Sequence, residues 1–232
     1  MSLLVSVTLK HFTVTCSDGL AVRIENGVLV PSSRSSCKYW TVAKGDIAMG
    51  STGSSFMGMM ISTFATSLAE KHLDDPELFS ILEKAIPDEL QRVNKLFPTN
   101  IEYLDGTESI NLGGTNLLMA GYDSSQQRIR SIFWGCLAKG ATDLNLTPRD
   151  CADKIQAIGY GKAVALVLEK LDVADCFTPW DVERNVKSVI QQAAEAFPQF
   201  IGGTIYTHVI SVPELKEIYE DLKNETAKLV AN

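Results

Sequence analysis

The sequence predicts an α+β fold in which two antiparallel β-sheets stack on one another and are covered on both faces by helices. The first reason is the order of the expected elements, which is four strands, two helices, two strands, two helices, one strand and one helix. Without a steady alternation of strands and helices, a doubly wound parallel sheet is disfavoured. The second reason is composition, because 45% of the 232 residues are hydrophobic and 21% are charged, which is enough for a core. No repeat or linker interrupts the chain, so we expect one domain over residues 1–232.

Charge and cysteine content exclude several functional classes. The formal net charge of −7 gives no electrostatic reason to bind nucleic acid or an anionic membrane surface. No apolar run is long enough to span a bilayer, and residues 1–7 lack the features of a secretory signal. The scattered cysteines form no CxxC pair, so we expect neither a zinc site nor a disulfide framework, and we expect a cytoplasmic location. They are Cys16, Cys37, Cys136, Cys151 and Cys176.

The first fifty residues indicate two β-hairpins. Apolar and β-branched residues over 12–16 and 20–24 flank Ser17-Asp18-Gly19, and an Asp-Gly pair between such runs is a strong hairpin signal. A second pair, over 39–42 and 47–49, flanks residues 43–46. The Ser-rich stretch 31–36 between the pairs predicts a polar loop, and the glycines over 50–53 are expected to end the second hairpin.

Two helices and another pair of strands follow. Apolar residues recur at helical spacing from Phe56 to His72 and again over 76–97, where Pro87 is a candidate break. Residues 116–122 and 128–134 then predict strands on either side of the turn at 123–125.

The last third of the chain predicts two helices, a strand and a final helix. Residues 141–154 are polar and are expected to form an excursion, and Gly159-Tyr160-Gly161 begins the first helix. Thr178 is a good N-cap, with Pro179 in the first turn of a helix that runs to about Phe197. A strand over 204–211 and a charged C-terminal helix from Pro213 complete the order.

Several of these segments together resemble the proteasome-like N-terminal-nucleophile (Ntn) hydrolases. The fragments are Ile158-Gly159-Tyr160-Gly161 before a small-residue helix, the Gly202-Gly203-Thr204-Ile205 turn before the strand at 206–210, and the strand and glycine turn over 46–53. The resemblance covers nearly the whole chain. It implies a four-layer αββα sandwich with the active cleft between the two sheets, at the end that carries Lys38 and Gly53.

The resemblance also implies a chemistry. In this family an N-terminal Thr, Ser or Cys attacks a peptide or amide carbonyl, and its free α-amine is the base. A lysine lowers the local pKa, an acidic residue positions that lysine, and a backbone N–H at the glycine turn stabilises the oxyanion. The reaction needs no metal or cofactor.

Two registers place these roles on the chain. In the first, the nucleophile strand begins at Thr8 after a short propeptide, Glu25 is the acidic residue, Lys38 is the family lysine, and Gly50 or Gly53 supplies the oxyanion N–H. In the second, Cys16 is the nucleophile and the acidic position falls on Ser32. We favour the first register because it retains both the stronger hairpin and an acidic residue.

Three functions stay open from the sequence. The first is a proteasome-like amide or peptide hydrolase that assembles into dimers or rings through the helix after the glycine turn. The second is a non-catalytic assembly or interaction protein on the same scaffold, favoured because Glu25 is followed by Asn26 and Gly27 where the family motif has Asp and then Arg. The third is a ligand-binding domain with a similar order of elements, which the absence of two stacked sheets would favour.

Overall fold

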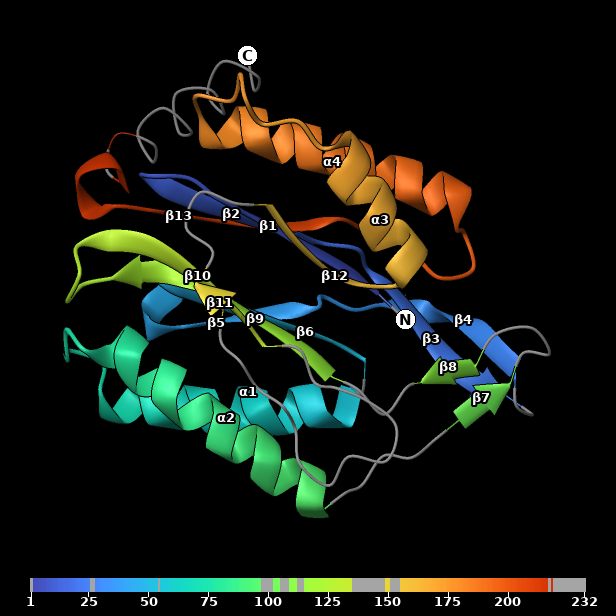
Figure 1. The fold of residues 1–232 in the computed structure, drawn as a ribbon, viewed down its shortest axis with the longest axis horizontal. Coiled ribbons are helices and arrows are strands. Elements are labelled where there is room, and N and C mark those ends of the chain that lie inside the picture. The colour runs from blue at the N-terminus through green and yellow to red at the C-terminus, as the bar shows by residue number, and fades with distance from the viewer. Residues whose placement is uncertain are drawn as a thin grey trace.

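Two antiparallel sheets lie face to face in the structure, and a pair of helices covers the outer side of each (Figure 1). The structure is a computed structural model. It describes residues 2–25, 28–53, 55–96, 102–104, 109–111, 115–134, 149–150, 155–216 and 218. The layer order is therefore helices, sheet, sheet, helices, which confirms the predicted αββα sandwich.

The first sheet has four strands and is covered by α3 and α4. Its order is β12 (Ile155–Gly159), β1 (Leu3–Thr8), β2 (Phe12–Ser17) and β13 (Tyr206–Ser211). The covering helices are α3 (Gly161–Lys170) and α4 (Pro179–Ala196). Because side chains alternate along a strand, one face of β1 and β2 is apolar and packs on these helices, and the other face looks toward the second sheet.

The second sheet has five strands and is covered by α1 and α2. Its order is β11 (Arg149–Asp150), β10 (Arg128–Trp134), β9 (Thr115–Asp123), β6 (Ile47–Gly53) and β5 (Tyr39–Val42), and the short helix η1 (Ala43–Gly45) joins β5 to β6. The helices are α1 (Ser55–Lys71) and α2 (Leu78–Leu96). Two small hairpins lie outside both sheets, β3 (Leu20–Glu25) with β4 (Val28–Ser35) and β7 (Glu102–Leu104) with β8 (Ser109–Asn111).

Local sequence explains where α4 starts. The Thr178 hydroxyl accepts the backbone N–H of Asp181, and the Asp181 carboxylate accepts the backbone N–H of Thr178, which together form a capping box. Pro179 occupies the first turn, where its missing N–H costs nothing. These contacts fix the helix start beside the edge of the first sheet.

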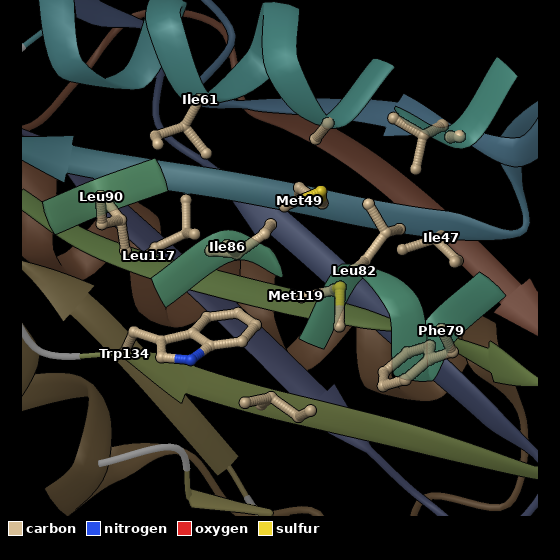
Figure 2. Close-up of a cluster of buried hydrophobic side chains, with 14 of the residues drawn as sticks. Ile47, Met49, Ile61, Phe79, Leu82, Ile86, Leu90, Leu117, Met119 and Trp134 are labelled. Atoms are coloured by element: carbon tan, nitrogen blue, oxygen red, sulfur yellow. The ribbon is translucent and has the colours of Figure 1, made fainter. Parts of the chain in front are cut away.

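A hydrophobic core lies between the second sheet and its helices (Figure 2). Trp134 of β10 and Met49 of β6 meet Leu82 and Leu90, which lie on one stripe of α2, and Ile61 of α1. Full burial of one such side chain stabilises the fold by roughly 1.5–3 kcal/mol. This core anchors β6, the strand that carries the glycine turn.

The space between the two sheets is partly polar. Hydroxyl groups of β1 and β2 form a buried ladder there, with Oγ–Oγ distances of 3.2 Å from Ser6 to Thr13, 3.3 Å from Ser6 to Thr15 and 3.1 Å from Thr8 to Thr13. Apolar clusters flank the ladder. Leu4 and Leu118 belong to one cluster, and Ile210 belongs to another. The hydroxyls satisfy one another, so the seam can be buried without unpaired groups at these positions.

Most predicted helices and strands are confirmed. The helices at 56–72 and 178–197, the hairpin over 39–49 and the strand pair over 116–134 match α1, α4, β5–β6 and β9–β10. Pro87 does not break α2. The C-terminal helix starts at residue 213 as predicted, and most of it lies outside the described residues, as do residues 141–148 and 151–154 of the expected excursion.

Two predictions for the first fifty residues are wrong. Residues 12–16 and 20–24 do not pair, because β2 lies between β1 and β13 while β3 pairs with β4. The expected loop over 31–36 is largely part of β4. Two strands were also not expected. β1 covers residues that were expected to form a propeptide, and β12 ends at Gly159, where a helix was expected to begin.

Candidate active site

Ser2, which precedes β1, and its neighbour Leu3 are held by hydrogen bonds to two other segments. The Ser2 carbonyl accepts the Tyr160 N–H at 2.9 Å, the Leu3 N–H donates to Asp18 Oδ1 at 2.7 Å, and the Leu3 carbonyl accepts the Asp18 N–H at 3.0 Å. Gly159 has φ +135° and packs so closely that a Cβ there would overlap the Ser2 carbonyl oxygen. Glycine is therefore required at 159, and Ser2 is fixed in place.

The Ser2 side chain belongs to the inner face of the first sheet. Alternation along the strand puts residue 2 on the same side as Leu4, Ser6 and Thr8, which look toward the second sheet. Its neighbour Leu4 packs directly on Gly50 of β6, where a Cβ would overlap Leu4 Cδ2. Ser2 thus lies at one end of the space between the sheets.

The Asp18 carboxylate joins three segments at this end. It is fully buried and accepts backbone N–H groups from Leu3, from Leu20 at 3.1 Å and from Gly202 at 3.3 Å. Burial raises the pKa of Asp18 above its ordinary value, while these hydrogen bonds and the charge of Lys38 act in the opposite direction. Asp18, which was expected to lie in a hairpin turn, is therefore a buried residue that holds three segments together.

Lys38 lies between the two sheets and is tied to both. Its backbone N–H donates to Ser17 Oγ at 3.3 Å, and its carbonyl accepts the Ser51 N–H at 3.0 Å. Burial lowers the pKa of the half-buried ammonium group, and the opposing interaction with Asp18 favours its charged form. Lys38 and Asp18 therefore influence each other's charge, and Asp18 is bonded to Leu3, the residue after Ser2.

The glycine turn reaches the same end through β6. At the start of β6, Ala48 packs near Ile210, whereas Gly50 packs on Leu4, so the strand runs toward Ser2. Gly53 ends the strand with φ +104°, is exposed, and pairs with Thr115. The structure thus brings Lys38 together with the glycine turn, as the resemblance implied.

Thr8 is not brought to this end. It ends β1 rather than beginning a strand, about 20 Å from Ser2 at roughly 3.3 Å per residue. Its side chain is buried, and its Oγ1 lies 3.1 Å from Thr13 Oγ1. The register that starts the nucleophile strand at Thr8 is therefore not the observed one.

Cys16 faces the helices that cover the first sheet, and Glu25 lies in a separate hairpin. The Cys16 side chain points into the core under α3 and α4, and burial raises its pKa to about 12, so the thiolate is strongly disfavoured. Glu25 ends β3 in the separate β3–β4 hairpin, where it pairs with Val28. Asp18 is an acidic residue whose charge acts on Lys38.

Sequence reasoning missed Ser2 and Asp18. The alternating pattern Val5-Ser6-Val7-Thr8 is a strand signal, and it could have identified β1 as the strand next to β2. Pairing β1 with β2 through the turn at 9–11 then sets Leu4 opposite Ser17, which leaves Ser2 and Asp18 just beyond the paired residues.

The described residues offer neither a metal-binding cluster nor a membrane-spanning helix. In the described part of the chain, no group of three or more His, Cys, Asp or Glu side chains could hold a metal ion. Among the described helices, none is both long enough and apolar enough to cross a membrane.

Comparison with solved structures identifies the fold. HslV from Trypanosoma brucei aligns with 90% of this chain and 99% of its own at 14% identity and a TM-score of 0.54. The BPH protein of Thiobacillus denitrificans, solved in complex with epoxomicin, aligns with 90% and 98% at 19% identity and a TM-score of 0.56. Comparison of the sequence with protein-family models and with curated proteins gives no match. The chain has the proteasome-like Ntn-hydrolase fold, as its sequence predicts.

Proposed function

We propose that the chain is a proteasome-like amide or peptide hydrolase whose nucleophile is Ser2, after cleavage of the Met1–Ser2 bond. The observation that supports this most is the convergence of Ser2, Asp18 and Lys38 at one end of the space between the sheets. Cleavage at that bond frees an α-amine on the same residue as the hydroxyl, and no rearrangement of β1 is needed to present it.

In the proposed reaction the Ser2 α-amine takes the proton of the Ser2 hydroxyl as Oγ attacks the substrate carbonyl. The positive charge of Lys38 lowers the pKa of this amine, so that it is neutral and basic near pH 7. Asp18 holds Lys38 charged. Backbone N–H groups at the glycine turn, with Gly53 as the candidate, stabilise the tetrahedral oxyanion.

The second half of the cycle uses the same groups. The protonated amine gives its proton to the departing amine, and an ester forms between the acyl group and Ser2 Oγ. Water then attacks the ester with the α-amine as base, which releases the carboxylic acid and restores the hydroxyl. Epoxomicin, the ligand of the BPH structure, is a suitable first probe for this site.

The test compares a chain that begins with Ser2 with one that retains Met1. We expect the first to hydrolyse fluorogenic peptide amides and the second to be inactive, because its Ser2 nitrogen is an amide and not a base. A Ser2→Ala chain with the same start is the matched control. Equal rates from the two starts, or no hydrolysis from either across a library of peptide amides, would contradict the proposal.

Assembly into oligomers is the second part of the proposal, and it holds for a catalytic or a non-catalytic chain. From Ser55 to Ala69, α1 has no charged residue, yet Met59 is 57% exposed and Thr63 and Thr66 are also exposed. An uncharged exposed helix face favours contact with a second copy. We expect light scattering to give a dimer or larger ring that Met59→Glu dissociates, and a monomeric wild type would contradict this.

The cysteines fit the cytoplasmic location that the sequence suggests. Cys16, Cys37 and Cys176 are all free thiols. Free thiols persist in reducing compartments.

A further inference from the structure

Within the part of the chain that the structure describes, the outer edge of β13 is open. β13 is the last strand in the order β12-β1-β2-β13, and among the described residues no strand pairs with its other side. Open edges present a row of unpaired backbone N–H and C=O groups to solvent, and soluble proteins usually protect them with charged residues or proline. β13, with the sequence Tyr-Thr-His-Val-Ile-Ser, contains neither proline nor a permanently charged residue.

Hydrogen bonding shows which backbone groups face outward. The Val212 N–H donates to the His11 carbonyl at 2.9 Å, so positions 212 and 11 form a hydrogen-bonded pair. Such pairs alternate along an antiparallel ladder, so His208 and Ile210 also bond to β2. The N–H and C=O groups of Thr207, Val209 and Ser211 therefore point away from the sheet.

The ladder on the other side of β2 leads to the same assignment. The Leu9 N–H donates to the Phe12 carbonyl, and the Asp18 N–H donates to the Leu3 carbonyl. Even-numbered residues of β2 thus bond to β1, which leaves its odd-numbered residues for β13. The two ladders agree on the outward groups of β13.

A groove of about 570 Å³ follows this edge. Five consecutive residues of β13, from Thr207 to Ser211, line it. The start of α4 forms one wall with Pro179, Trp180 and Glu183, and the β5–β6 turn with Lys216 forms the other. The groove is large enough for a ligand and runs along the unpaired backbone.

The two walls differ in chemistry. On the α4 side, Trp180 is 39% exposed and Val209 is 37% exposed, which offers an apolar surface to alternate side chains of a bound strand. On the opposite wall Lys216 lies 3.0 Å from Asp46, whereas Lys44 is exposed and makes no ion pair within the described residues. Glu183 is paired with Lys187, so Lys44 is the charged lining residue for which the described part of the chain shows no ion pair.

We propose that the outer edge of β13 binds an extended polypeptide segment, which adds to the first sheet as a fifth strand. Its apolar side chains lie against Trp180 and Val209, and the alternating side chains toward Lys44 are acidic. β2 lies between β13 and β1, the strand that Ser2 precedes, and the site uses the outer side of β13, so binding here does not require hydrolysis. Failure of one proposal therefore leaves the other standing.

The probe is a fluorescein-labelled peptide amide with the repeat Val-Glu-Val-Glu-Val-Glu, titrated with the full chain and followed by anisotropy. We expect saturable binding to the wild-type chain. Val209→Pro should bind the peptide at least about tenfold more weakly, because proline removes one outward N–H and its ring keeps the peptide from approaching β13 closely. Val209→Ala keeps that N–H and is the matched control, with a loss of only a few fold. Because the Val209 N–H is not bonded to β2, we expect the Tm of Val209→Pro to stay within about 5 °C of wild type.

A second readout keeps the test decisive if Val209→Pro does not fold. On the wild-type chain, bound peptide should slow amide hydrogen exchange at Thr207, Val209 and Ser211 and leave His208 and Ile210 unchanged. A Val-Lys repeat should bind more weakly than the Val-Glu repeat, and Lys44→Glu should reverse that order. No binding at millimolar peptide, or equal binding to Val209→Pro and Val209→Ala, would overturn the proposal. So would self-association through β13 that excludes the peptide, which would assign the edge to a second copy of the chain.

Discussion

The two ends of β1 carry the same functional group in opposite surroundings. Ser2, just before the strand, adjoins Leu3, whose N–H binds the buried Asp18 carboxylate, and the charge of Asp18 acts in turn on Lys38. Thr8, at the other end, is surrounded by the hydroxyls of the β1–β2 ladder and is buried. A hydroxyl becomes a nucleophile only with a base and a nearby charge. The difference teaches that position relative to Lys38, and not residue type, identifies the candidate nucleophile.

The largest expected effect comes from removing the charge that distinguishes the two ends. For a chain that starts at Ser2, we expect Lys38→Ala to lower kcat for peptide amides by about 10²–10³-fold, the usual cost of removing one electrostatic catalytic group. Circular dichroism and Tm should show that the domain still folds. Lys44→Ala, at the remote β5–β6 turn, is the control and should keep its rate. A fully active Lys38→Ala variant would remove Lys38 from the mechanism.

Asp18→Asn should reduce both stability and activity. An amide offers one acceptor oxygen where the carboxylate accepts three backbone N–H groups, so we expect a loss of about 2–4 kcal/mol in unfolding free energy. The turnover of the folded fraction should also fall, because Lys38 loses its partner. Urea unfolding and active-site titration separate the two losses. Unchanged turnover per folded molecule would limit Asp18 to a structural role.

The pH profile should report Lys38 directly. The pKa of Lys38 lies below its ordinary value of 10.5 because of burial. Activity should rise with pH as the Ser2 amine loses its proton. At higher pH it should fall as Lys38 becomes neutral, and this fall should come before pH 10.5 is reached. In Lys38→Arg the guanidinium stays charged, so the alkaline fall should disappear from the residual activity. An alkaline limb unchanged in that variant would assign it to another group.

Asp18 should also change how the free energy of unfolding depends on pH. Because its pKa is raised in the folded state, its carboxylate is ionised more easily in the unfolded chain. Its contribution to stability is therefore greatest below the unfolded pKa of 3.8 and is lost as pH rises from there through the folded pKa. Asp18→Asn should abolish this component of the pH dependence in chemical denaturation. A wild-type component of the opposite sign would show that the hydrogen bonds outweigh burial.

The smallest effect should come from the Thr8 end. Thr8→Val removes one hydroxyl from the ladder, and we expect a change in unfolding free energy of about 1 kcal/mol. The hydrolysis rate should stay within about twofold of wild type, because Thr8 is remote from Lys38. A loss as large as that of Lys38→Ala would reverse the assignment of the two ends.

The sequence predicts the outer helices better than the first sheet. Apolar spacing identifies α1 and the Thr178 cap identifies α4, since both signals are local. The hairpin prediction around Asp18 failed because its carboxylate binds N–H groups of Leu3 and Gly202, which are distant in sequence. Lys38 and the glycine turn were identified through the family resemblance. Ser2 was missed because its role depends on the register between β1 and β2.

The most direct test of the central claim is the site of covalent labelling. The chain is incubated with epoxomicin, its intact mass is measured, and the adduct is located by peptide mapping. We predict a single adduct on a peptide that begins with Ser2, absent from Ser2→Ala and retained in Thr8→Val. An adduct on a chain cut before Thr8 or Cys16, or none on a chain that begins with Ser2, would contradict the assignment.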